Sequence, residues 1–145
     1  MRWPESTTKL LQRIEPPRMQ TSALMTTRLV LTVSGAIEAA TAVALILNPE
    51  LVARLLLGIG LSGSGVAVAR VAAFGLLSLA IACWPNAKVA NTPAIRALFV
   101  YNLLVGLYLA YLRVGGKFAG YLLWPACILH VLLALQLARP AYKGV

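Results

Sequence analysis

Four long apolar stretches run through the chain, and polar segments separate them. They cover residues 29–47, 66–84, 95–112 and 118–137. Each is about 18 to 20 residues long, which at about 1.5 Å of rise per residue matches the hydrocarbon core of a bilayer, about 30 Å thick. None has the polar stripe, repeated every turn, that a soluble amphipathic helix carries. The pattern predicts an all-α integral membrane protein with four transmembrane helices.

The second and third connections between these stretches are short. They cover residues 85–93 and 113–117. A short connection forces the helices on either side of it to be antiparallel neighbours. We therefore expect a four-helix bundle with up-down topology.

The first connection contains the signals of a shorter helix. Asn48, Pro49 and Glu50 have the residue types of a helix cap, a first-turn proline and a first-turn acid. The apolar run 51–57 that follows is too short to cross a bilayer, and Gly58 ends it. These residues predict a short interfacial helix after the first span.

One proline lies inside the fourth stretch. Pro125 has no N–H to donate to the carbonyl of Tyr121, so a helix that began at residue 118 would bend there. We expect a kink about one turn before His130.

Charge divides the chain into a basic segment, residues 1–28, a membrane domain, residues 29–139, and a tail, residues 140–145. The 13 basic residues outnumber the 4 acidic ones. On the side of the two termini lie Arg2, Lys9, Arg13, Arg18, Arg28, Lys88, Arg96, Arg139 and Lys143; on the other side lie Arg54, Arg113 and Lys117. The positive-inside rule then places both termini in the cytoplasm. Topology accounts for the basic excess, so we expect lipid headgroups and no nucleic acid as partners of segment 1–28, part of which we expect to be disordered.

Each stretch carries one strongly polar residue, and these form the candidate site: Glu38, Arg70, Asn102 and His130. A polar side chain in hydrocarbon costs at least a few kcal/mol unless it finds a partner. Counted from the cytoplasmic end of each span, Glu38, Asn102 and His130 fall in one layer about 10–14 Å deep. Arg70 lies nearer the outer surface, but its side chain reaches about one further turn. We therefore predict an ion pair between Arg70 and Glu38.

Three interpretations of these residues stay open, and the small size of the bundle makes the third less favourable than the other two. In the first, the Glu38–Arg70 pair fixes the helix register, and Asn102 and His130 bind helices together. In the second, Glu38 or His130 exchanges protons or holds the polar head of a quinone or lipid. The lining of such a site would include Tyr101, Tyr108, Trp124 and Cys127. In the third, the polar residues line a pathway for protons or a small solute, which four short helices accommodate only as an oligomer.

No catalytic or metal-binding pattern is evident. Cys83 and Cys127 lie at depths about 15 Å apart, beyond the reach of a disulfide, so we expect two free thiols. Cys127 and His130 face the same way, but a metal site needs three or four ligands, and we expect none here. The sequence has no serine–histidine–acid set and no phosphate loop with its lysine. These features favour a protein that is not an enzyme.

Three motifs resemble those of the DoxX-like small four-helix membrane proteins of bacteria. In the run 69–84, Arg70 is followed by Phe74-Gly75-Leu76; the others are Tyr101-Asn102, and Leu123-Trp124-Pro125-Ala126 with His130. The resemblance implies a bundle in the bacterial inner membrane, and some relatives are linked to quinone-dependent oxidation as subunits beside a catalytic partner. It assigns no catalytic residue. We expect a non-enzymatic accessory or scaffold subunit with a membrane-protein partner or a second copy, or alternatively a quinone- or lipid-binding subunit of a membrane oxidoreductase.

Overall fold

The computed structural model of the chain is all-helical over the residues that it describes, which are 17–84 and 92–143, without the side chains of 17–24 and 143. The helices are α2 (Pro17–Leu47), α3 (Pro49–Leu57), α4 (Gly63–Ala82), α5 (Thr92–Val114) and α6 (Leu123–Lys143). Four of them, all but α3, are long and apolar enough to cross a membrane. The chain is therefore a multi-pass membrane protein, and the predicted four-helix up-down bundle with a short helix after the first span is confirmed. Of the predicted basic segment 1–28, residues 1–16 lie outside the described residues, and residues 17–28 form the first part of α2.

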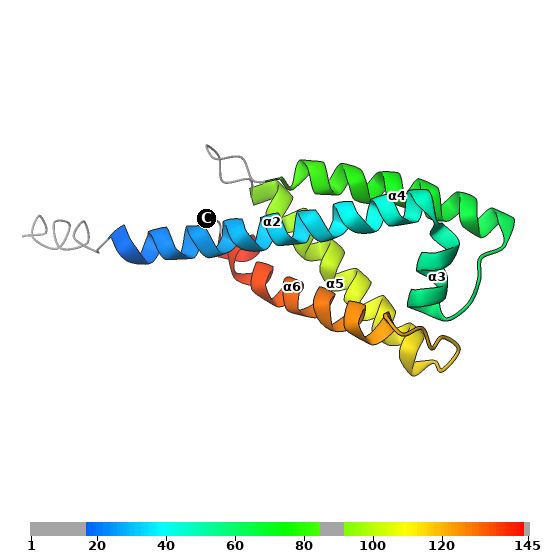
Figure 1. Cartoon of the computed structure of the whole chain (residues 1–145). Helices are drawn as coiled ribbons and strands as arrows, with labels where there is room; N and C mark the ends of the chain where they lie inside the picture. Colours follow the sequence, from blue (N-terminus) through cyan, green and yellow to red (C-terminus); the bar gives the residue numbers. More distant parts are fainter. Residues whose placement is uncertain (1–16, 85–91, 144–145) are drawn as a thin grey trace, which may run out of the picture.

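The four spans form two antiparallel pairs. Helix α2 packs along α4, and α5 packs along α6 (Figure 1). The pairs meet near the end of the bundle where the chain terminates, and they diverge toward the end where α3 lies between them. We call the second of these the α3 end. Contacts of α2 with α6 join the two pairs.

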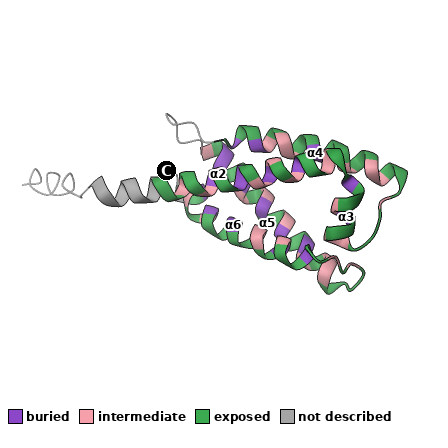
Figure 2. Ribbon diagram, in the orientation of Figure 1, coloured by how far each residue is buried: buried purple, intermediate pink, exposed green. Residues whose placement is uncertain are grey.

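At the end away from α3, all four spans contribute to one apolar cluster. Its buried members are Leu31 of α2, Cys83 at the end of α4, Ala94, Ile95 and Leu98 of α5, and Leu137 and Ala141 of α6. From this cluster toward the α3 end, buried residues lie on the sides of the helices that face one another, and the outward sides are exposed (Figure 2). In a membrane these outward apolar side chains face lipid.

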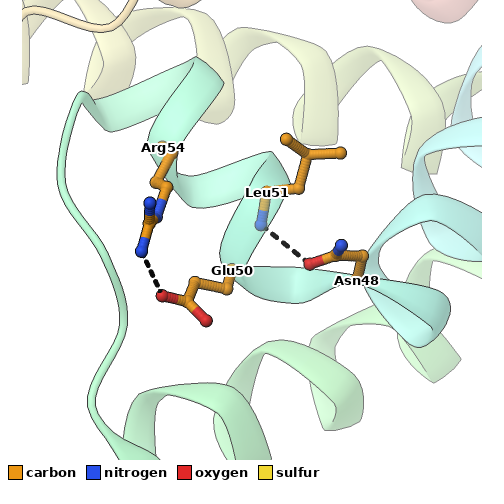
Figure 3. A network of polar contacts seen from close by, with 4 residues as sticks. All are labelled: Asn48, Glu50, Leu51 and Arg54. Atoms are coloured by element: carbon orange, nitrogen blue, oxygen red, sulfur yellow. Dashed lines mark hydrogen bonds and ion pairs between the residues drawn. The ribbon is translucent and has the colours of Figure 1, made fainter.

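Helix α3 has the predicted capping signals in place. The Asn48 side chain accepts a hydrogen bond of 3.0 Å from the Leu51 N–H, and Pro49 begins the helix (Figure 3). Gly58 ends it in the left-handed conformation, with φ of 78°, and donates its N–H to the Arg54 carbonyl. Local sequence is sufficient to define this helix.

The segment before α6 differs from the prediction, because α6 begins at Leu123 and not at residue 118. The intervening residues are held by the exposed carbonyls at the C-terminus of α3. The Ala119 N–H donates to the Leu57 carbonyl at 3.2 Å, and the Leu122 N–H donates to the Leu55 carbonyl at 2.9 Å. Gly120 lies so close to α3 that a β-carbon on it would overlap the backbone of Leu56. These contacts satisfy carbonyl groups that a helix leaves without partners at its C-terminus.

The predicted kink at Pro125 is wrong for the same reason. Because α6 begins at Leu123, Pro125 falls in the first turn, where a helical N–H has no intrahelical partner in any case. At its other end α6 continues past Pro140 to Lys143, beyond the expected end of the span. There Arg96 Nε donates to the Ala141 carbonyl at 3.1 Å, one of the carbonyls that a helix leaves without intrahelical partners at its C-terminus.

Candidate functional site

The central polar contact joins the two helix pairs. Glu38 of α2 is 1% exposed, and its Oε2 accepts a hydrogen bond of 3.1 Å from the hydroxyl of Tyr101 on α5. A buried carboxylate needs such a partner, because removing it from water without one costs several kcal/mol. The bond therefore ties α2 to α5 near mid-span.

A second polar contact lies within the α5–α6 pair. Asn102 of α5 is fully buried, and its Oδ1 lies 2.8 Å from Nδ1 of His130 on α6. The Asn102 amide donates from Nδ2 to the Leu98 carbonyl at 2.8 Å. With the amide nitrogen so engaged, Oδ1 can only accept, and His130 must therefore carry a proton on Nδ1. The contact fixes the orientation of the imidazole ring.

Tyr101 connects the two contacts. Its ring meets the His130 ring edge to face, with centroids 5.8 Å apart and planes at 78°. Glu38, Tyr101, Asn102 and His130 thus form one group, which we call the polar layer. It lies between the apolar cluster described above and a second one at the α3 end, whose buried members are Leu109, Leu123 and Cys127.

Two buried oxygens beside the polar layer have no hydrogen-bond partner among the described residues. They are Oε1 of Glu38 and the hydroxyl oxygen of Ser34, one helical turn earlier on α2. A buried polar group without a partner costs about 1–3 kcal/mol. Ser34 was not among the predicted site residues, although its position four residues before Glu38 places both on one face of a helix.

The predicted Arg70–Glu38 ion pair does not form. Gly35 of α2 lies against the Ala80 carbonyl of α4, which sets the register of this pair. Counted from that contact at 1.5 Å per residue, Arg70 lies about 10 Å nearer the α3 end than Glu38. Arg70 is also on the exposed side of α4. The only ion pair among the described residues joins Arg54 to Glu50 on α3, at 2.7 Å (Figure 3).

Of the expected lining residues, Tyr101 and Cys127 lie inside the bundle. The Cys127 thiol donates to the Gly106 carbonyl at a sulfur–oxygen distance of 3.5 Å. Tyr108 and Trp124 are exposed. Trp124 instead lies beneath the guanidinium of Arg113, 6.0 Å from its ring centroid, which is a cation–π distance.

The polar layer supplies hydrogen-bonding groups from three helices. Among residues 17–84 and 92–143, no three side chains of His, Cys, Asp or Glu lie close enough together to hold a metal ion. Both cysteines are free, as predicted. The chemistry that these residues offer is the acceptance and donation of hydrogen bonds at mid-span.

Comparison with protein-family models, with curated proteins and with solved structures finds no match to this chain.

Proposed function

We propose that the chain is a non-enzymatic accessory or scaffold subunit of a bacterial inner membrane, of the DoxX-like kind. The observation that supports this proposal best is the hydrogen bond from Tyr101 to Glu38, which joins the two helix pairs. Together with the Asn102–His130 contact it uses three of the four strongly polar residues of the spans, Glu38, Asn102 and His130, to hold helices to one another. Hydrogen bonds of this kind help helices to associate in lipid, where the hydrophobic effect does not drive them together.

The proposed orientation has both termini in the cytoplasm. Arg28, Arg96 and Arg139 belong to the end of the bundle away from α3, whereas Arg54 and Arg113 belong to the α3 end. Basic residues near span ends favour the cytoplasmic side. Labelling of single cysteines at Ser64 and at residue 88, with a reagent that does not cross membranes, tests the orientation. Intact cells should be labelled at Ser64→Cys alone.

A second candidate function is a quinone- or lipid-binding subunit of a membrane oxidoreductase. It is favoured by two buried oxygens, Glu38 Oε1 and Ser34 Oγ, that have no hydrogen-bond partner in the part of the chain that the structure describes. The Ser34 hydroxyl can donate to a quinone carbonyl, and the carboxylate oxygen can accept from a hydroxyl of the reduced ring. Both atoms are sealed from the surface, so a head group would enter only after α2 moved away from α5.

Extraction into native lipid discs, followed by native mass spectrometry, separates the two functions. A subunit of the first kind should retain a protein partner in a fixed ratio and only bulk lipid. A stoichiometric quinone or a single lipid species would favour the second function.

Glu38→Gln then tests the role of the polar layer, with Glu50→Gln as the matched control on the exposed surface of α3. The scaffold proposal expects Glu38→Gln to reduce stability without removing any small molecule. An equally stable variant that loses a bound small molecule would contradict it.

A further inference from the structure

Arg70 is an exposed cation inside a membrane span. It follows the first residue of α4, Gly63, by seven residues, which places it about 10 Å into the helix. Charged side chains within membrane spans almost always face the interior of a bundle or pair with an opposite charge. Arg70 is exposed on α4, and it has no ion-pair partner among the described residues. An opposite charge has to come from outside this part of the chain.

Helix α4 is also the least enclosed of the four spans. Only 11% of its apolar stretch is buried, against 28% in each of the other three. It packs along α2, and it lies at the edge of the bundle with its outer side exposed (Figure 2). A neighbour is therefore free to approach α4 from that side.

The exposed side of α4 carries both small side chains and large apolar ones, among them Phe74 and Ile81, which are 55% and 69% exposed. Ala67, Val71 and Gly75 follow one another at four-residue spacing, and Ser78 lies on the same side. A β-carbon on Gly75 would have no neighbouring atom within 4 Å, so packing inside this chain does not account for the glycine. Small side chains beside large apolar ones allow another helix to pack against this side of α4.

We propose that this side of α4 docks a transmembrane helix of a different protein, and that Arg70 pairs with a carboxylate of that helix. The inference rests on the proposed accessory role and assigns the partner a position and a charge. The paired charges would lie about a third of the way across the bilayer from the α3 end, where the low dielectric strengthens their attraction.

A second copy of the chain is a poorer occupant than a different protein. Symmetric packing through the same face would bring two Arg70 side chains to the same depth, where they repel. The two carboxylates among the described residues are both elsewhere: Glu38 is buried at another level, and Glu50 pairs with Arg54. Neither can neutralise Arg70 in such a dimer.

A lipid phosphate is the other source of negative charge. Side chains on a helix lean toward its N-terminus, so Arg70 can extend toward the headgroups at the α3 end. A phosphate would, however, leave the small residues deeper in the span without a role, because Gly75 and Ser78 lie about 18 Å and 22 Å from the start of the helix. A helix partner accounts for both the charge and the small side chains.

Site-specific photo-crosslinking of the full chain in its native membranes tests the proposal. The photoreactive residue replaces Val71 on the exposed side of α4 or, as a control of equal exposure, Leu135 on α6; these side chains are 67% and 66% exposed. We expect the Val71 probe to capture one second protein and the Leu135 probe to capture lipid.

Variants of Arg70 test the role of the charge. Arg70→Leu should reduce the capture at the Val71 probe about tenfold or more, and Arg70→Lys should retain it. Arg113→Gln is the control for the loss of a positive charge elsewhere.

A charge exchange completes the test. Arg70→Glu should abolish the capture, and an arginine in place of the acidic residue in the partner's span should restore it. Capture of lipid alone at Val71, with a protein captured at Leu135, would overturn the α4 proposal and leave the accessory role standing. No protein at either position would overturn both, and capture of a second copy, or capture insensitive to Arg70→Leu, would overturn the proposed pairing.

Discussion

The hydroxyl of Tyr101 donates a 3.1 Å hydrogen bond to Glu38 Oε2 and so joins a helix of one pair to a helix of the other. Glu38 is fully enclosed at this point, and its second oxygen has no partner among the described residues. The Tyr101 hydroxyl is therefore the one group in the described part of the chain that hydrogen-bonds this carboxyl group.

Tyr101→Phe should destabilise the folded protein by about 1–3 kcal/mol, because it leaves a buried carboxyl group with no hydrogen bond. Unfolding in lipid discs measures the change, and Tyr121→Phe is the control, since Tyr121 is 91% exposed. In a double-mutant cycle, adding Tyr101→Phe to Glu38→Leu should cost much less than adding it to the native chain. Equal effects of Tyr101→Phe and Tyr121→Phe would contradict the structural role of the bond.

The contact between Asn102 and His130 leads to a spectroscopic prediction. Because the Asn102 amide nitrogen is bonded to the Leu98 carbonyl, its oxygen faces the imidazole and requires a proton on Nδ1. Nitrogen NMR of the protein in lipid should therefore find His130 protonated at Nδ1, and Asn102→Leu should remove this preference. A ring protonated only at Nε2 in the native chain would show that the amide is oriented the other way.

Gly120→Ala should be strongly destabilising, by about 1–3 kcal/mol or more, because the added methyl group would overlap the Leu56 backbone. The backbone bonds from Ala119 and Leu122 to α3 depend on this close approach. Gly63→Ala is the matched control, since a β-carbon there meets no atom within 4 Å. Thermal unfolding of both variants in the same lipid decides the matter, and equal melting temperatures would mean that residues 118–122 do not hold α3.

The sequence was sufficient for the features that depend on local patterns. The length of each apolar stretch predicted the four spans. Helix α3 was predicted from Asn48, Pro49 and Gly58, because capping involves only neighbouring residues. The depth of a residue in its span also follows from counting, which is how Glu38, Asn102 and His130 were assigned to one layer.

The predictions that were wrong concern features that depend on how helices rotate and slide against one another. Counting along a span gives no information on which side of α4 Arg70 occupies, so the pair with Glu38 was wrong. The start of α6 was missed because residues 118–122 are more favourable as hydrogen-bond donors to α3 than as a helical turn. That competition is tertiary, and no local pattern at Pro125 reveals it.

The two cysteines give a prediction about reactivity. Cys83 and Cys127 are both buried, and each thiol donates to a backbone carbonyl of a neighbouring helix, Ala94 and Gly106 respectively. Burial also raises the pKa of the Cys83 thiol, which lies just past the end of α4, above its ordinary value. At a given pH, less of this residue is then present as the reactive thiolate.

Both thiols of the folded protein in lipid should therefore react with a maleimide roughly a hundredfold more slowly than an exposed cysteine, because reaction has to await a local opening of the packed helices. The reference is Ser64→Cys in a variant in which both native cysteines are replaced by alanine. As the pH is raised, the labelling rate of Ser64→Cys should increase at a lower pH than the rate of Cys83. In denaturant all three cysteines should react at similar rates. Rapid labelling of Cys83 before unfolding would mean that α4 separates from α5 in the native state, and the apolar cluster that joins all four spans would then be open at that end.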